Sequence, residues 1–302
     1  MCALFGIVDY RGLIGTKQMN KMISVLSRAC EVRGTDATGI AYNTRDSLCI
    51  HKRPLPAHRM CMRIPYGARV IMGHTRMTTQ GNEKHNYNNH PFYGSADTDF
   101  ALAHNGVLSN DILLQKSENL PDTIIETDSY VAVQLIEKKG ELNADSLAFM
   151  AEKLRGTFTI TVLDRNNNLY FVKGDNPMCI YHCKDKGFYI YASTEEILKS
   201  ALARLSLRPE RFEKVALYCG DILKIDKFGR QTKTEFDVRN LYWYDYPYSF
   251  SEPAPTKKHT ESSYVRELKF IASGFGYSPE CVDYLIEEGF TPDDIEDIFY
   301  CG

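Results

Sequence analysis

The stretch MCALFGIVDY (residues 1–10) places a cysteine directly behind the initiator methionine, at the head of an apolar run. From Ala3 to Val8 the residues are mostly apolar, which is typical of a strand that is covered on both faces. If Met1 is removed, Cys2 carries both a thiol and a free α-amine. Such an amine has a reference pKa of about 7.7–8.0, so it can be neutral and accept a proton near neutral pH. The stretch therefore predicts a buried strand that begins with a nucleophile and a base on one residue.

The composition bounds the class of protein. The chain has 302 residues, 43% of them hydrophobic, which is enough for the core of one large domain or two. Its formal net charge of −3 offers no basic field for nucleic acid. The nine cysteines are an odd number at scattered positions, and we see neither a secretory leader nor an apolar run of the ~18 residues that a membrane helix needs. We therefore expect free thiols in a reducing cytoplasm and no membrane segment.

The order of the expected elements favours an α+β fold. Residues 17–29 have the spacing of an amphipathic helix, and residues 157–164 and 169–174 form a hairpin pattern around three asparagines. Strands and helices come in blocks joined by hairpins, which favours antiparallel sheets with helices packed outside. Two long polar stretches, 76–98 and 109–126, flank the apolar run FALAHNGVL (100–108). Loops of this length in a compact domain are usually functional.

The C-terminal part has a separate composition. Residues 246–263 are rich in proline and serine and are expected to form a linker. Residues 264–302 show three short helical patterns and hold nine acidic and two basic residues, a formal charge of −7. We expect a small acidic three-helix bundle that packs against another protein surface, because about 39 residues are marginally stable alone. The stretch FGYSPECVDYLIEEGF (275–290) resembles ubiquitin-associated three-helix modules. From this resemblance we infer only that the segment binds a partner.

Five segments occur together in a specific order. They are MCALFGIV (1–8), RGTDATGI (33–40), GHTRMTTQG (73–81), HNGVLSN (104–110) and ETDSY (126–130). Over residues 2–245 this series resembles the class II glutamine amidotransferases, a family of N-terminal-nucleophile enzymes. The resemblance implies a four-layer αββα sandwich of antiparallel sheets for residues 2–245. It also implies L-glutamine as the substrate, hydrolysed through a thioester on Cys2.

The resemblance assigns the catalytic groups. Cys2 supplies the nucleophile and the base, since its thiolate attacks the amide carbon and its α-amine hands a proton to the leaving ammonia. Asn105 and Gly106 follow an apolar run, so a side-chain N–H and a backbone N–H can point together at a developing oxyanion. An Asn-Gly pair is also the commonest hairpin turn, which is the competing interpretation of these two residues.

Four further residues are expected to bind the substrate. Arg76 suits a bidentate grip on an α-carboxylate, and Thr79 and Gln80 follow it in the segment that folds over the substrate in the family. Asp128 suits the α-ammonium group, so that an arginine and an aspartate read the two charges of an amino acid. Helix capping by Thr127 and Asp128 explains the same pattern equally well from the sequence alone.

The remaining family positions are expected to support the site. Arg33 and Asp36 match the RG-x-D segment around the nucleophile. His74, His90 and His104 are expected to be structural, because the α-amine already provides the base. Neither a metal site nor a nucleotide cofactor is indicated by any motif, and Cys179 and Cys183 are a lone CxxxC pair that favours packing over a metal.

Three departures from the family pattern qualify the comparison. CALFG replaces the usual CGIxG, Met77 stands where some relatives have tryptophan, and Gln80 where some have histidine. We expect a separate protein to supply the ammonia acceptor, because residues 246–302 resemble no synthase domain. The other hypotheses are an N-terminal-nucleophile hydrolase for another γ-glutamyl or acyl compound, and a non-catalytic binding protein that retains Met1.

Overall fold

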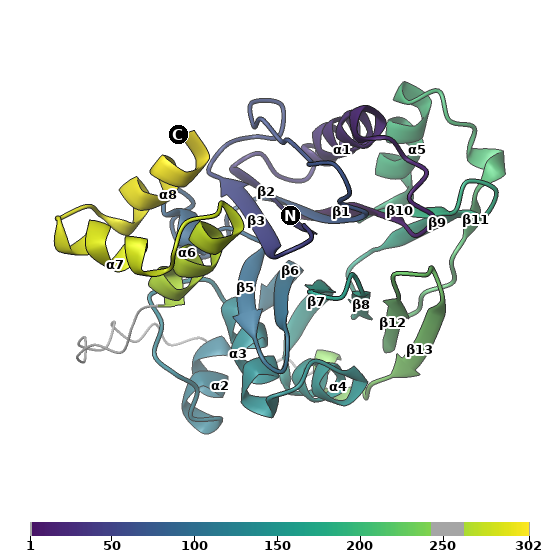
Figure 1. Ribbon diagram of the computed structural model, residues 1–302. Helices are drawn as coiled ribbons and strands as arrows, with labels where there is room; N and C mark the ends of the chain where they lie inside the picture. The colour runs from purple at the N-terminus through teal and green to yellow at the C-terminus, as the bar shows by residue number, and fades with distance from the viewer. Residues whose placement is uncertain (1, 243–262, 302) are drawn as a thin grey trace.

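The computed structural model describes residues 2–242 and 263–301 (Figure 1). Within these ranges the fold is α+β with two antiparallel sheets, as the sequence predicts. No helix in the described ranges is long and apolar enough to cross a membrane.

The first sheet carries the N-terminal strand near its centre, in the order β11-β9-β10-β1-β4-β2-β3. Every residue of β1 is buried, which explains why its sequence is apolar without alternation. Its neighbours are antiparallel, with Phe5 opposite Ala192 on β10 and Ala3 opposite Thr75 on β4. The strands are β1 (Ala3–Asp9), β2 (Ala37–Asn43), β3 (Leu48–Arg53), β4 (Val70–Arg76), β9 (Cys179–Cys183), β10 (Phe188–Ala192) and β11 (Glu213–Lys214).

The second sheet has the order β13-β12-β8-β7-β6-β5. Its long central pair is β6 with β7, where the register runs from Phe100 opposite Asp164 to Leu108 opposite Gly156. The strands are β5 (Phe92–Ser95), β6 (Asp99–Leu108), β7 (Gly156–Asp164), β8 (Leu169–Lys173), β12 (Asp221–Ile225) and β13 (Gln231–Glu235).

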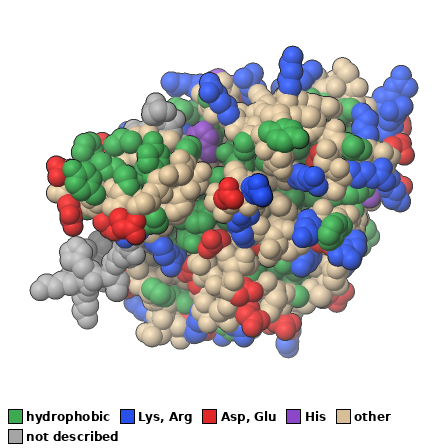
Figure 2. Space-filling view, viewed as in Figure 1, with side chains coloured by type: hydrophobic (Ala, Val, Ile, Leu, Met, Phe, Trp, Pro, Cys, Tyr) green, Lys and Arg blue, Asp and Glu red, His purple; other side chains and the backbone are tan. Residues whose placement is uncertain are grey.

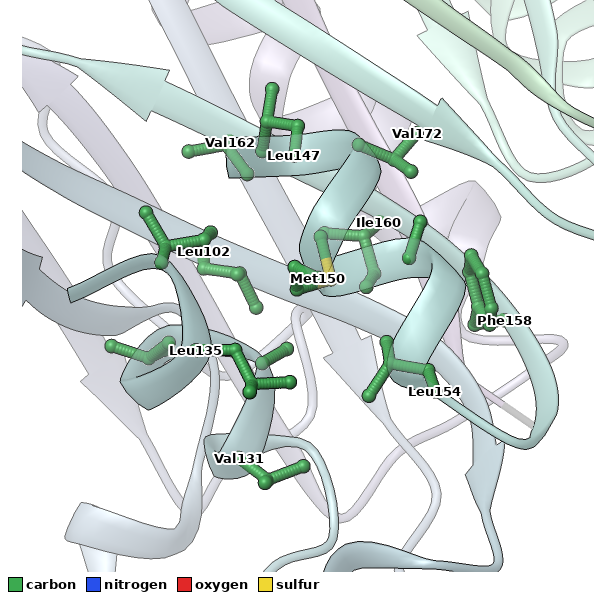
Figure 3. Packing of buried hydrophobic residues seen from close by; sticks show 14 of the residues in the cluster. Leu102, Val131, Leu135, Leu147, Met150, Leu154, Phe158, Ile160, Val162 and Val172 are labelled. Carbon is green, nitrogen blue, oxygen red and sulfur yellow. The ribbon is translucent and has the colours of Figure 1, made fainter. Parts of the chain in front are cut away.

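Helices cover the outer face of each sheet (Figure 1). Helices α1 (Thr16–Cys30) and α5 (Glu195–Arg204) share a core with β1 and β10, whereas α3 (Tyr130–Lys139) and α4 (Ala144–Lys153) share one with β6, β7 and β8. Figure 3 shows the second of these cores, in which Leu135 and Met150 point toward Leu102 and Ile160 of the sheet. A third apolar cluster, with Leu4, Met72, Phe171 and Tyr191, joins the two sheets.

The C-terminal helices, α6 (Ser263–Gly274), α7 (Glu280–Glu287) and α8 (Pro292–Cys301), pack beside β3 and β5. They have a small core of their own around Leu268, Val282 and Ile295. Their main contact surface with the rest of the molecule, called the dock below, is polar and aromatic. Lys52 pairs with Glu267 at 2.9 Å, and the ring of Phe270 stacks on Tyr93 at 4.3 Å between centroids. Most of the linker expected at 246–263 lies outside the described residues.

Several local predictions are corrected by the structure. The polar stretch 109–126 contains helix α2 (Asp111–Ser117), and the stretch 76–98 contains the 3-10 turn η1 (Asn86–Asn88) as well as β5. Helix α7 begins at Glu280 without a side-chain cap, and the Ser278 hydroxyl before it donates to the Glu280 carboxylate. Two further 3-10 turns, η2 (Pro209–Arg211) and η3 (Arg239–Tyr242), flank β11 to β13.

Candidate functional site

The predicted residues are brought to one place by the ends of three strands. Cys2 directly precedes β1, and Arg76 ends β4. Because Ala3 lies opposite Thr75 in the register, Cys2 and Arg76 are neighbours at one end of the adjacent strands β1 and β4. Asn105 and Gly106 come from β6 of the second sheet. The site therefore lies where the two sheets meet.

Cys2 is half-buried and held by its backbone. Its carbonyl accepts a hydrogen bond from Arg33 Nε at 2.7 Å, and its Sγ lies 3.5 Å from the Met77 carbonyl oxygen. Burial raises the pKa of the Cys2 thiol, whereas the charge of Arg76 lowers it and that of Asp128 raises it. The Cys2 thiol is therefore protonated near neutral pH. The charges of Arg76 and Asp128 both act on this thiol.

Asn105 is fully buried and joined to the first sheet through Ser193. The Asn105 amide Nδ2 lies 3.5 Å from Ser193 Oγ, and the Asn105 carbonyl accepts from Asn176 Nδ2 at 2.9 Å. Ser193 in turn accepts from the Leu4 amide at 2.8 Å and donates its own amide to the Leu4 carbonyl at 2.9 Å. Ser193 thus connects Asn105 with the strand that begins at Cys2. It belongs to no motif that sequence reasoning singled out.

Gly106 occupies a position that only glycine can fill without rearrangement. Its φ is +155°, and a Cβ there would lie 1.8 Å from the Thr157 carbonyl oxygen and 2.6 Å from His104 Nε2. Asn105 and Gly106 both lie within the continuous pairing of β6 with β7, opposite Thr159 and Phe158. The alternative interpretation of this pair as a two-residue hairpin turn is therefore wrong.

Arg76 is buried, with 3% of its surface exposed, and its guanidinium is held by uncharged oxygens. Nη1 donates to Asn89 Oδ1 at 2.7 Å and Nη2 donates to the Gln80 carbonyl at 2.6 Å. Burial lowers the pKa of Arg76, and the nearby carboxylates of Glu83, Asp128 and Asp36 oppose this. Its positive charge is therefore oriented by the protein while no carboxylate among the described residues forms an ion pair with it.

The segment after Arg76 is fastened at several points. Asp36 donates its backbone amide to the Arg76 carbonyl at 3.0 Å and accepts from the Thr78 amide at 2.7 Å. Gln80 is exposed, and its Nε2 donates to Asp111 Oδ2 at 3.2 Å and to the Glu126 carbonyl at 3.0 Å. Thr79 is exposed at the tip of the same segment. The segment is thus tied to the 109–126 region by Gln80 and to the 33–36 region by Asp36.

Asp128 is buried and does not cap helix α3, whose N-cap residue is Ser129 without a side-chain cap bond. Its Oδ2 accepts from the Leu108 amide at 2.6 Å, and its Oδ1 accepts from the Ser129 hydroxyl at 3.1 Å. The capping interpretation of Asp128 is therefore wrong. The carboxylate instead fixes β6 two residues after Gly106.

The three histidines lie in the interior beneath the site. His74 Nε2 is 3.0 Å from the His104 carbonyl, and the ring of His74 lies 4.3 Å from that of His90. Burial lowers the pKa of His74 to about 3, and it lowers the pKa of His90 and of His104 as well. All three are neutral at pH 7. His104 Nδ1 also lies 2.8 Å from the Ser129 hydroxyl, beside Asp128.

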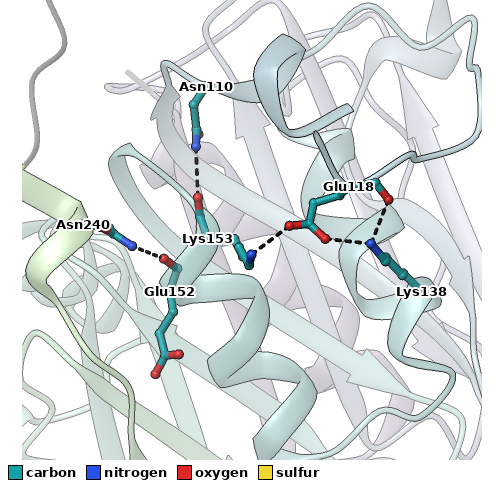
Figure 4. A network of polar contacts seen from close by, with 6 residues as sticks. All are labelled: Asn110, Glu118, Lys138, Glu152, Lys153 and Asn240. Carbon is teal, nitrogen blue, oxygen red and sulfur yellow. Dashed lines mark hydrogen bonds and ion pairs between the residues drawn. The ribbon is translucent and has the colours of Figure 1, made fainter. Parts of the chain in front are cut away.

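Helix α2 is braced by polar contacts at both of its ends (Figure 4). Glu118 forms ion pairs with Lys138 at 2.6 Å and with Lys153 at 2.8 Å, which attach the end of α2 to α3 and α4. Asn110 Nδ2 donates to the Lys153 carbonyl at 2.9 Å. Between α2 and α3 lies a cavity of about 180 Å³ that Gln80, Asp111 and Glu126 border. The described residues contain no cluster of three or more ligand side chains that could hold a metal ion.

Known proteins resemble this chain in sequence. Residues 74–200 match the family model of the glutamine amidotransferase domain. The glutamine–fructose-6-phosphate aminotransferase (isomerizing) of Listeria innocua is 33% identical over 196 residues, which cover 62% of this chain and 31% of the relative. The enzyme of the same name from Staphylococcus aureus strain N315 is 31% identical over 215 residues, which cover 68% of this chain and 33% of the relative. The chain thus matches about a third of the length of these relatives.

Two solved structures share the fold. The glutamine phosphoribosylpyrophosphate amidotransferase of B. subtilis has a TM-score of 0.59 at 18% identity, covering 79% of this chain and 50% of that chain. A structure described as the allosteric regulatory enzyme of purine biosynthesis has a TM-score of 0.62 at 20% identity, covering 80% and 50%.

The family match shows a glutamine amidotransferase domain in this chain, and the two solved structures share its fold. The domain is of class II, which confirms the resemblance seen in the five sequence segments.

Proposed function

We propose that this chain is a stand-alone glutaminase subunit that hydrolyses L-glutamine to glutamate and ammonia and passes the ammonia to a separate synthase. The observation that carries the proposal is that Arg76 lies beside Cys2 at one end of β1 and β4, while Asp128 is hydrogen-bonded to β6 two residues after Gly106. A cation and an anion beside one thiol fit the two charges of an α-amino acid whose side-chain amide reaches the sulfur. We further interpret the layered sheets and helices as the four-layer sandwich of N-terminal-nucleophile hydrolases, with residues 264–302 as a separate bundle.

The reaction begins once Met1 has been removed, because Cys2 then gains a free α-amine. The amine takes the proton of the Cys2 thiol, which is needed since burial raises the pKa of that thiol. The sulfur attacks the carboxamide carbon, and the C=O electron pair moves to oxygen. The Asn105 amide and the Gly106 backbone N–H donate to this oxyanion. When the C–N bond breaks, the amine returns the proton to the leaving ammonia and a γ-glutamyl thioester remains.

Water then attacks the thioester and completes the turnover. The α-amine accepts a proton from the water, the C–S bond breaks, and the sulfur recovers a proton as glutamate leaves. Arg76 is assigned to the α-carboxylate and Asp128 to the α-ammonium group. Thr79 and Gln80 cover the substrate from the segment that follows Arg76, while Arg33, Asp36, His74 and His104 hold the surrounding backbone.

An exposed apolar surface beside the site supports a protein partner. Met77 and Val107 directly follow Arg76 and Gly106 and are each 48% exposed. Ile112 and Leu113 on α2 and Ile124 in the following loop are 44–60% exposed. Exposed apolar residues near a site that releases ammonia fit the docking of a synthase, since a covered exit keeps the ammonia from water.

The decisive experiment measures glutamate and ammonia release from purified protein whose N-terminus has been checked by intact mass spectrometry. We expect turnover from the trimmed chain, alone or with a candidate synthase, and background rates from Cys2→Ala and from protein that retains Met1. A substrate panel with Arg76→Ala distinguishes glutamine from other γ-glutamyl or acyl amides, because only a free α-carboxylate needs this arginine. Failure of the trimmed chain to bind or hydrolyse glutamine under all these conditions contradicts the proposal.

A further inference from the structure

A series of buried polar side chains connects the C-terminal helices with Arg76. We infer that Asn89 is a positioning residue for the Arg76 guanidinium and that the C-terminal helices set its position through η1. The inference rests on the proposed function in one respect, the assignment of Arg76 to the α-carboxylate of the substrate. The connection itself consists of contacts that the structure describes.

Asn89 orients Arg76 without cancelling its charge. Asn89 is completely buried, and its Oδ1 accepts from Arg76 Nη1 at 2.7 Å. Its Nδ2 donates to the Glu83 carbonyl at 2.8 Å and lies 3.3 Å from Asn86 Oδ1. A carboxylate at this position would form an ion pair with the guanidinium and compete with the substrate. A neutral amide instead leaves the full positive charge for a bound carboxylate.

The turn η1 has two sets of contacts. Toward the site, Asn88 Nδ2 donates to Glu126 Oε2 at 2.7 Å, and Asn89 follows directly and binds Arg76. Toward the C-terminal helices, the ring of Tyr87 packs on Tyr264 of α6 with 5.2 Å between centroids. Asn86 Nδ2 donates to the Lys52 carbonyl at 2.8 Å. A displacement of η1 therefore moves the contacts of Arg76.

The dock behind η1 is made of buried charges. Lys52 and Glu267 form an ion pair at 2.9 Å with side chains that are 0% and 3% exposed. Glu296 of α8 is 1% exposed and accepts from the Tyr264 hydroxyl at 2.7 Å. Separating such groups leaves uncompensated charge in a low-dielectric interior, which is strongly unfavourable. The C-terminal helices therefore hold Lys52 and η1 in one arrangement.

The first experiment compares Asn89→Ala with Asn89→Asp in steady-state assays. Both variants lose the Nδ2 donor, and only the aspartate adds a negative charge beside Arg76. The substrates are L-glutamine and its analogue with an amide in place of the α-carboxylate. We expect Asn89→Asp to raise the KM for glutamine about tenfold or more, and Asn89→Ala to raise it less. The kcat/KM for the analogue changes less than about threefold in either variant. Equal losses for both substrates overturn the positioning role.

The second experiment follows hydrogen exchange of residues 78–91 in the full chain. Asn86→Ala and Glu267→Gln interrupt the connection at two points, and Tyr264→Phe is a milder variant that removes one hydroxyl if Glu267→Gln does not fold. Lys269→Ala is the matched control, because it removes an ion pair with Asp283 within the C-terminal helices. We expect faster exchange and a higher KM for glutamine in the first group only. Exchange equal to that of the control overturns the coupling.

The two experiments separate this inference from the proposed function. If the trimmed wild-type chain neither binds nor hydrolyses glutamine, the proposed function fails and the exchange data alone decide the coupling. If wild-type turnover is normal and neither KM nor exchange responds to the substitutions, the proposed function stands and the inference fails.

Discussion

The two sides of the site are built differently. The strand side consists of Cys2, Asn105 and Gly106, whose backbones are set by β1 and β6. The loop side consists of residues 76–91, which include one short turn and are held mainly by asparagine and aspartate side chains. Sheet pairing fixes atoms that must meet within tenths of an ångström. Side-chain hydrogen bonds fix groups that must release and take up a substrate. We therefore expect the strand side to control kcat and the loop side to control KM.

The strand side is tested most directly at Asn105. Asn105→Ala removes one oxyanion donor, so we expect kcat to fall about 10²–10³-fold with KM changed only a few-fold. Asn105→Asp keeps the shape and replaces the donor by a carboxylate, so its kcat should fall at least as far. Steady-state kinetics on glutamine measures both. A kcat within threefold of wild type in Asn105→Ala would remove Asn105 from the chemistry.

The dock supports the loop side, and we expect its contribution to the stability of the protein to depend on pH. Burial raises the pKa of Glu296 to about 7, while Lys52, Asn86 and Tyr264 lower it and Glu267 raises it. The folded state then binds more protons than the unfolded state between the usual carboxyl pKa and about 7. This contribution to stability is complete below the usual carboxyl pKa and is lost as pH rises from there to about 7, by at most about 3 kcal/mol.

Thermal or denaturant unfolding at pH 5.5 and pH 8 measures this difference. Glu296→Gln cannot ionise, so we expect it to remove most of the dependence and to be no less stable than wild type at pH 8. A wild-type stability that is unchanged between these two values contradicts the expectation.

Arg76→Lys separates charge from geometry on the loop side. Lysine keeps the positive charge but cannot reproduce the fork that contacts Asn89 and the Gln80 carbonyl. We expect the KM for glutamine to rise about 10–100-fold, which corresponds to roughly 1.5–3 kcal/mol, with a smaller change in kcat. A decrease confined to kcat would assign Arg76 to the strand side and break the comparison.

Gln80→Ala should have the smallest effect. The Gln80 side chain is exposed, and its two hydrogen bonds join the loop to Asp111 and to the Glu126 carbonyl. Exposed hydrogen bonds of this kind contribute about 0.5–1.5 kcal/mol each, so we expect a KM increase of a few-fold. Equal kinetics for Gln80→Ala and wild type would leave the loop held by Asp36 and the asparagines alone.

The sequence predicted the parts of the site that lie in local patterns. The apolar run after Cys2 and the run before Asn105 identify strands, and these strands bring Cys2 and Asn105 to the place where the two sheets meet. The α+β class and the antiparallel sheets followed from the same periodicity. The role of Asp128 was ambiguous, because helix capping and a contact to the Leu108 amide need the same residue type in front of a helix.

The rest depends on contacts between residues far apart in the chain. Ser193 meets Leu4 across 189 positions, and Glu267 meets Lys52 across 215. Glu296 lies in an acidic segment whose composition is typical of a solvated surface, yet its side chain is buried against Tyr264. Asn86 and Asn89 stand in a polar stretch that is typical of a loop, and no local pattern indicates that Asn89 holds Arg76 or that Asn86 contacts Asn89.

Ser193 has a consequence for catalysis at a distance. Cys2 directly precedes a strand of one sheet, whereas Asn105 and Gly106, the proposed oxyanion donors, belong to the other, and Ser193 connects the two sheets. Their separation therefore depends on how the two sheets are placed against each other. Interior residues such as Phe171 and Tyr191, whose rings pack edge to face with 4.8 Å between centroids, set this placement. Substitutions deep between the sheets can thus slow turnover while every group that touches the substrate is unchanged.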